Sequence, residues 1–394
     1  MNNIHSVFTS RKEGFKYKIL PSQNDFNVLN EAKKSVRSYL KTHIKEYLES
    51  HQIPHISPKF RVQGSWAYGT CNAPAKLGQE MDVDYGVYLP VRAFDGFDVD
   101  TQSEQARTYF EAIESMLEEL CKENGWKLDT SKSSCIRLKI QDNAHMDIPL
   151  YAVPDSMFDS FQEKNEIALT TESARFDSIH ESKDWFVLDE DFIAFSEESL
   201  QDMDIQTIHM ARRDGSWQSS DCEIIRQWFS TRLEKEPNGG QQLRSICRYL
   251  KAWRDWVFDE NGAPSSILLM IIACQYYEYK QGRDDLALLN ILENLSQSLN
   301  NNVYENIKEH ENEDFNRMSP NEREIAKIYA DNLYKNFIYC LKNSNKDSIL
   351  TSLTKQWGER IPRTHDLIEI NIEPFCGQSL IQDTITPQVP LRQG

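Results

Sequence analysis

The sequence of 394 residues contains no long hydrophobic segment. Its longest apolar run, Ile267 to Cys274, is far shorter than the roughly 20 residues that a membrane-spanning helix needs. Its first residues, Met1 to His5, also lack the charged and apolar regions of a secretory signal. We therefore expect a cytoplasmic protein that does not bind a membrane.

Paired cysteines are missing as well. The eight cysteines are scattered along the chain without a CxxC motif or a Cys/His cluster, and several lie in apolar segments. This pattern argues against a zinc site and favours buried free thiols in a reducing compartment.

Positive charge is scarce. The chain has 44 Lys and Arg against 61 Asp and Glu, which gives a formal net charge of −17. Proteins that bind duplex nucleic acid use clustered Lys and Arg to neutralise phosphates, so this composition argues against a broad nucleic-acid surface. A bound nucleotide would have to be held by a local positive pocket.

The chain does contain a glycine turn followed by a pair of aspartates. Asp82-Val83-Asp84 lies in an apolar segment that predicts a strand, on which residues two apart share a face. Two carboxylates this close repel each other unless a cation such as Mg²⁺ lies between them. Upstream, Gln63-Gly64-Ser65 leads into a short predicted helix, where backbone N–H groups can approach a phosphate.

A third carboxylate strengthens this interpretation. Residues His145 to Tyr151 predict another apolar strand, which carries Asp147 on one face. Such an acid completes the three-carboxylate ligand set of a two-metal site. Each motif alone has an ordinary explanation, because Gly-Ser can be any turn and Asp-x-Asp is common at strand ends. Their combination favours the metal site.

Two basic patterns are candidates for contacts with a nucleotide. In the predicted strand Ser134 to Ile140, basic residues alternate with apolar ones; this basic face either faces solvent or reaches a base or a phosphate, and Arg137 is the candidate. In the predicted helix 241–258, three cations share one face: Arg244, Arg248 and Lys251. That face is either solvated or turned inward. In so acidic a chain we favour an inward role on triphosphate oxygens, with Lys251 as the main contact.

Hydrophobic periodicity predicts an α+β domain followed by helices. An amphipathic helix from Asp25 to about Gln52 and a second helix closed by Asn124-Gly125 alternate with the predicted strands. A capping box around Ser220 starts the all-helical half. The predicted limits are 1–218 for the α+β domain, 155–204 for an insertion of helices and loops within it, 219–375 for the helical domain and 376–394 for a flexible tail.

These residues together resemble a known family, the bacterial cGAS/DncV-like nucleotidyltransferases, and within it the cyclic GMP-AMP synthases. The resemblance covers most of residues 60–275 and keeps the family's order. It rests on seven blocks: Gln63-Gly64-Ser65; Gly78-Gln79-Glu80-Met81-Asp82-Val83-Asp84; Gly86 with Tyr88 and Pro90; Cys135 with Arg137 and Lys139; Asp147-Ile148-Pro149-Leu150-Tyr151-Ala152; Lys251-Ala252-Trp253-Arg254-Asp255; and Pro264-Ser265-Ser266.

The resemblance implies a polymerase-β-like nucleotidyltransferase palm, with a mixed central sheet and flanking helices, clasped by an all-helical C-terminal domain. It implies that Asp82, Asp84 and Asp147 are catalytic and bind two Mg²⁺ ions, which Mn²⁺ can replace. The nucleotide contacts that it implies are Gln63, Gly64, Ser65, Tyr68, Arg137, Ser220, Lys251, Ser266 and Asp314.

The reaction expected from this resemblance joins ATP and GTP into 3′,3′-cyclic GMP-AMP and releases pyrophosphate. The product would be a second messenger of anti-phage (CBASS) defence that activates an effector protein. The chain has neither the zinc-binding insert nor the basic DNA platform of the animal relatives, so no DNA activator is expected. In some systems of this family a ubiquitin-like conjugation pair of the E1/E2 type acts on the synthase's C-terminus, and Gly394 is the residue it would use.

Three alternatives stay open. A related enzyme could make another cyclic di- or trinucleotide, because base choice depends on the shape of the pocket. An enzyme with the same palm could add nucleotides to an RNA end or to a protein, although a basic track along the strand would then be expected. The third is a catalytically silent nucleotide-binding or scaffold protein, which the presence of all three aspartates does not support.

Overall fold

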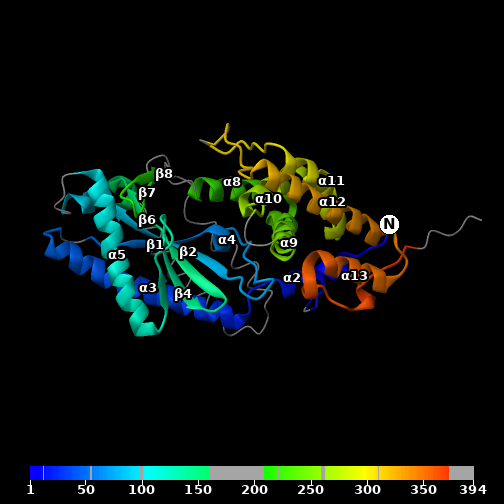
Figure 1. Cartoon of the computed structure of the whole chain (residues 1–394), viewed down its shortest axis with the longest axis horizontal. Helices are drawn as coiled ribbons and strands as arrows, with labels where there is room; N and C mark the ends of the chain where they lie inside the picture. The colour runs from blue at the N-terminus through cyan, green and yellow to red at the C-terminus, as the bar shows by residue number, and fades with distance from the viewer. Residues whose placement is uncertain are drawn as a thin grey trace, which may run out of the picture.

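The computed structural model describes residues 1–394 except residues 12, 54–55, 97–100, 160–207, 220–221, 259–261, 309 and 372–394. A sheet flanked by helices, which we call the palm, lies beside a bundle of helices, which we call the helical body (Figure 1). The predicted α+β fold with a helical C-terminal region is confirmed. Ser220, Gly394, the tail 376–394 and nearly all of the predicted insertion 155–204 lie outside the described residues.

The palm is built on one mixed sheet. Its strand order is β3-β4-β5-β2-β6-β7-β8, and β1 pairs with β2 outside this path. β2 is central, because it pairs antiparallel with β1 and parallel with both β5 and β6. The strands are β1 (Lys59–Gln63), β2 (Met81–Pro90), β3 (Lys127–Asp129), β4 (Ile136–Gln141), β5 (Ala144–Ile148), β6 (Leu150–Val153), β7 (His209–Ala211) and β8 (Trp217–Ser219).

Strand β2 places core side chains on one face and the predicted site residues on the other. Met81, Val83 and Tyr85 are buried in the hydrophobic core of the palm. Since alternate residues of a strand point to opposite faces, Asp82 and Asp84 lie on the other side. The predicted strand and its shared acidic face are therefore confirmed.

The strand that was predicted from His145 onward is divided at Pro149 into β5 and β6. Proline has no N–H group to donate to a neighbouring strand. Its carbonyl oxygen still accepts a hydrogen bond from Val87 N, at 3.0 Å, so β5 and β6 follow one another along β2.

Two long helices pack against each other and against the sheet: α3 (Gln23–Ser50) and α5 (Gln102–Asn124). Helix α3 begins at a capping box between Ser22 and Asp25. Helix α5 ends at Gly125, whose φ of 72° is the left-handed conformation that closes many helices. Both helices were predicted from periodicity and are confirmed.

The helical body contains the C-terminal half of the described chain. Its helices are α8 (Cys222–Glu234), α9 (Gln241–Val257), α10 (Ser266–Tyr276), α11 (Asp284–Asn300), α12 (Pro320–Lys342) and α13 (Lys346–Trp357). Short elements elsewhere are α1 (His5–Thr9), α2 (Phe15–Lys18), α4 (Gly64–Ala67) and the 3₁₀ helices Val91–Gly96, Pro237–Gly240, Gly358–Arg360 and His365–Leu367. No helix in the described part of the chain is long and apolar enough to span a membrane.

The N-terminal residues pack in the helical body and not in the palm. Phe8 and Phe15 of α1 and α2 contact Tyr249 and Trp357, with ring centroids 5.1 to 6.0 Å apart. Both phenylalanines are fully buried. The domain limits at residues 218 and 375 stay predictions, but the core of the helical body also draws on residues from before the palm.

Candidate functional site

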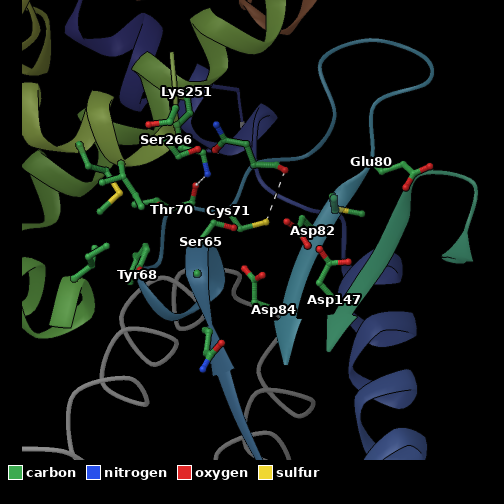
Figure 2. A pocket seen from close by; sticks show the side chains of 18 of the residues that line it. Ser65, Tyr68, Thr70, Cys71, Glu80, Asp82, Asp84, Asp147, Lys251 and Ser266 are labelled. Atoms are coloured by element: carbon green, nitrogen blue, oxygen red, sulfur yellow. Dashed lines mark hydrogen bonds between the residues drawn. The ribbon is translucent and has the colours of Figure 1, made fainter. Parts of the chain in front are cut away.

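A cavity of about 780 Å³ lies between the palm and the helical body. Figure 2 shows acidic side chains from the strands on one side of it and Lys251 and Ser266 from the helices on the other. Among the predicted site residues, those that line it are Gln63, Gly64, Ser65, Tyr68, Asp82, Asp84, Asp147, Lys251 and Ser266. The structure thus brings together residues that are up to about 200 positions apart in the sequence.

The three aspartates meet at adjacent positions of two parallel strands. In the register of β2 and β5, Asp84 lies opposite Asp147 and Asp82 lies opposite His145. One ligand atom from each of Asp82, His145 and Asp147 lies within 4.8 Å of the other two, so a divalent cation fits between them. These groups can therefore form a metal site.

The pKa of Asp84 reflects its burial and the negative charge close to it. Its burial, followed by the charges of Asp82 and Asp147, raises its pKa to about 7. A divalent cation among the three carboxylates would favour their charged forms and offset the repulsion between them. The three carboxylates therefore fit a divalent cation.

The Gly64 turn lies directly against Asp84. Gly64 has a φ of +61°, and a Cβ atom built on it would lie 1.9 Å from Asp84 Oδ2. Only glycine meets both demands, a left-handed backbone and no side chain. Ser65 follows at the start of α4 and lines the cavity.

Gln63 is held by two tyrosines. Its amide nitrogen donates to Tyr88 Oη, and its amide oxygen accepts from Tyr151 Oη at 3.0 Å. The two rings are stacked with centroids 4.7 Å apart. Although Gln63 reaches the cavity, both polar atoms of its side chain are hydrogen-bonded to these tyrosines. The two bonds anchor Gln63, which directly precedes the Gly64 turn.

Arg137 forms a bidentate ion pair with Asp147 and does not line the cavity. Its Nε and one terminal nitrogen each lie 2.6 Å from a different oxygen of the carboxylate. Hydrogen bonding to Asp147 raises the pKa of this guanidinium above its ordinary value. On the same strand, Lys139 lies 3.2 Å from Glu80. The basic face of β4 therefore supplies counter-ions to acids at or beside the site.

The helical body contributes a buried lysine. Lys251 of α9 is 6% exposed, and its Nζ donates to the carbonyl oxygen of Thr70 at 2.8 Å. Burial lowers the pKa of this amine. Arg244 and Arg248 are buried as well, but neither is among the residues that line this cavity.

The other predicted contacts fall in different places. Tyr68 lines the cavity with its ring edge-on to Phe229, and Ser266 accepts a hydrogen bond from Arg254 at 2.9 Å. Asp314 does not line this cavity. Its carboxylate accepts from two backbone N–H groups and from Arg323 within a loop of the helical body.

Sequence reasoning missed Glu80 and His145. His145 is two residues before Asp147 on the same strand, and Glu80 is two residues before Asp82, so the two-residue period of a strand could have placed both beside the aspartates. It also missed two cysteines, Cys71 and Cys135, which are buried and line the cavity.

A mixed sheet with paired carboxylates on its central strand, next to a glycine-serine turn and opposite a buried lysine, defines the chain as a nucleotidyltransferase. The family profile "Cyclic GMP-AMP synthase DncV-like, nucleotidyltransferase domain" matches residues 58–151, and the profile "Cyclic GMP-AMP synthase, C-terminal domain" matches residues 240–370. The cyclic GMP-AMP synthase of Vibrio cholerae serotype O1 is 30% identical over 326 residues, 68% of this chain and 69% of that protein. The chain therefore belongs to the DncV-like cyclic GMP-AMP synthase family.

Other relatives agree with this assignment. The cyclic GMP-AMP synthase of Escherichia coli strain TW11681 is 33% identical over 241 residues, which cover 59% of this chain and about half (50%) of that protein. The fold matches the crystal structure of Vibrio cholerae DncV in complex with the linear intermediate 5′ pppA(3′,5′)pG, with a TM-score of 0.70, 23% identity and coverage of 94% of this chain and 99% of that one. The same enzyme in complex with GTP and 5MTHFGLU2 gives a TM-score of 0.72 at 22% identity, again over 94% and 99% of the two chains.

Proposed function

We propose that this chain joins ATP and GTP into 3′,3′-cyclic GMP-AMP in the cavity between the palm and the helical body. The observation that carries the proposal is the meeting of three carboxylates, the Gly64–Ser65 turn and Lys251 around one space. The relatives support the product and the two substrates, since they are cyclic GMP-AMP synthases and one solved relative holds a linear adenosine-guanosine intermediate.

The three aspartates are the proposed ligands of two Mg²⁺ ions, which Mn²⁺ can replace. When bound, these ions neutralise phosphoryl oxygens and lower the pKa of the attacking ribose hydroxyl. Asp82 and Asp84 present their carboxylates from β2, and Asp147 presents its own from β5. Arg137 holds the Asp147 carboxylate in a fixed orientation and is therefore assigned a positioning role.

The remaining residues bind and orient the nucleotides. The turn at Gly64 and Ser65 offers backbone N–H groups to a triphosphate, and Lys251 offers a positive charge from the opposite wall. Tyr68 and Ser266 line the same cavity and are proposed contacts of the nucleotides. Asp314, which the structure does not bring to the cavity, has no part in this proposal.

The proposed reaction takes place in two condensations. In the first, a ribose hydroxyl of one nucleotide attacks the α-phosphorus of the other, the bond to the β-phosphate breaks, and pyrophosphate leaves. The linear dinucleotide triphosphate then turns over in the cavity. The second hydroxyl attacks the remaining α-phosphorus, a second pyrophosphate leaves, and the ring closes.

The test is to incubate the purified protein with Mg²⁺ and four radiolabelled nucleoside triphosphates, and to omit one nucleotide at a time. Phosphatase-resistant label that needs both ATP and GTP and is fully cleaved by nuclease P1 is the expected result, with Asp82→Ala as the blank. Label that needs other bases would change the product to another cyclic nucleotide. Label found only on added RNA or on protein would contradict cyclisation.

The cellular role stays a prediction. A cyclic GMP-AMP product would act as a second messenger in anti-phage defence and would activate an effector protein. Conjugation of Gly394 by an E1/E2-type system is a separate prediction, which mass spectrometry of the protein isolated from a defence-competent host would test.

A further inference from the structure

We propose that His145 is a direct ligand of the divalent ion held by Asp82 and Asp147, and that it shifts the preference of this site toward Mn²⁺ over Mg²⁺. The inference rests on the proposed function in one respect only, namely that a cation binds at these carboxylates. It adds a nitrogen ligand to a site for which only carboxylates were predicted.

The first observation is a pair of buried polar atoms without partners. His145 is 6% exposed, yet its Nε2 has no hydrogen-bond partner among the described residues, and the same holds for Asp82 Oδ1. The two atoms lie 3.2 Å apart, which is an ion-pair distance if the imidazole is protonated, but they do not meet the geometry of a hydrogen bond. A buried polar atom without a partner costs free energy. A cation bound to both atoms would provide the missing partner.

The second observation concerns the other ring nitrogen. His145 Nδ1 lies 2.7 Å from Glu80 Oε2, in hydrogen-bonding geometry. With Nδ1–H donating to this carboxylate, the lone pair of Nε2 faces Asp82 and Asp147. Histidines that bind metals almost always donate their second nitrogen to a carboxylate, carbonyl or water in this way. Glu80 is itself fixed by Lys139, at 3.2 Å.

The third observation is the position of His145 in the sheet. It lies opposite Asp82 in the parallel register and two residues before Asp147, so the three side chains leave the same face. His145 Nε2 lies 3.9 Å from Asp147 Oδ1. That oxygen already accepts from Arg137, but a carboxylate oxygen has a second lone pair for a cation.

The preference for Mn²⁺ follows from ligand chemistry. Mg²⁺ is bound in proteins almost entirely through oxygen and keeps several waters. First-row transition ions accept imidazole more readily, and their affinity for mixed nitrogen and oxygen sites rises from Mn²⁺ onward. Replacing one oxygen ligand by Nε2 therefore favours Mn²⁺.

The test is pulsed electron paramagnetic resonance of the full-length protein with Mn²⁺ and no nucleotide. An imidazole nitrogen bound to Mn²⁺ produces ¹⁴N modulation of the electron spin echo. We expect this modulation in the unmodified protein and in His43→Ala, a control that removes a histidine of α3 that does not line the cavity. It should be absent in His145→Ala, whose circular dichroism spectrum checks that the variant is folded.

Calorimetric titration supplies a second readout. In His145→Ala the affinity for Mn²⁺ should fall about tenfold or more while that for Mg²⁺ falls less, so the ratio of the two affinities shrinks. In Glu80→Gln the ¹⁴N modulation should persist with weaker binding, because the ring keeps an acceptor for Nδ1–H.

The outcomes separate the two proposals. Mn²⁺ that binds through the aspartates without ¹⁴N modulation would overturn the role of His145 and leave the proposed function intact. If Mn²⁺ fails to bind but the protein makes normal cyclic product with Mg²⁺, the role of His145 is again overturned and the proposed function is not. Loss of both binding and product would overturn both.

Discussion

Replacing Gly64 by alanine places a methyl group in the space that Asp84 occupies. The Cβ atom would lie 1.9 Å from Asp84 Oδ2, whereas real Cβ atoms do not approach closer than 3.0 Å. The carboxylate must therefore retreat by about 1 Å, or the turn must move away by as much. Either movement changes the position of the Gly64 turn relative to the Asp84 carboxylate, and the proposed function needs both in place.

The size of the effect can be worked from this displacement. A misplacement of about 1 Å in a reactive arrangement lowers the rate roughly a hundredfold. This corresponds to about 2.7 kcal/mol of activation free energy. In addition, Gly64 has a φ of +61°. An L-residue in this left-handed region costs roughly 1–2 kcal/mol of folded-state stability.

A second glycine separates these two effects. Gly282 has a φ of +63°, and nothing lies within 4 Å of a Cβ built on it. Gly282→Ala should therefore lower the free energy of unfolding by the backbone cost alone and leave kcat/KM unchanged. Urea denaturation and the rate of cyclic product formation measure the two quantities. A Gly64→Ala enzyme that keeps more than a third of the activity would refute the steric argument.

Three further predictions concern charges and thiols. The Arg137→Lys variant cannot form both bonds to Asp147, so its kcat should fall about tenfold or more. The control is Arg213→Lys, which alters the bidentate pair with Glu114 at a position that does not line the cavity. This control should leave kcat unchanged in the same assay. Burial alone would raise the pKa of Asp314, but hydrogen bonds from two backbone N–H groups and from an arginine outweigh it and lower the pKa. The stability that these hydrogen bonds provide is fully present above the unfolded pKa of about 3.9 and is lost as the pH falls through the folded pKa. The Asp314→Asn variant should therefore be less stable at pH 7, and its stability should fall less steeply as the pH is lowered. An unchanged acid limb of the stability curve would contradict the lowered pKa of Asp314. Burial raises the pKa of Cys71 to about 11, so iodoacetamide at pH 8 should leave this thiol unmodified in the folded protein and react with it in urea, as peptide mass spectrometry would show.

Local patterns in the sequence were enough to predict the main elements. The period of apolar residues and the glycine that closes a helix at Gly125 reflect energies that act within a few residues, and α3, α5 and α9 lie where those patterns placed them. The two-residue period of β2 likewise placed Asp82 and Asp84 on one face. Such signals survive in the sequence because the interactions that produce them are short in range.

Contacts between distant residues left weaker signals. The pairing of Arg137 with Asp147 depends on the register of β4 against β5, in which the two residues are direct partners. Periodicity showed that β4 has a basic face but could not show what lies across it. The burial of Phe8 and Phe15 in the helical body has the same cause, because their partners lie more than 200 residues away.

The same limit applies to how the two halves of the cavity are held in place. The loop before β2 is bound to α9: Asn72 Nδ2 donates to the carbonyl oxygen of Arg248 at 2.9 Å, and Gln79 Nε2 donates to that of Asp255 at 2.7 Å. Lys251 donates to Thr70 in the same loop. Because β2 carries Asp82 and Asp84, these bonds fix the distance between the two aspartates and the lysine that faces them. A proline- and glycine-containing loop is therefore what joins the two walls of the site, although its sequence alone predicts only a connection.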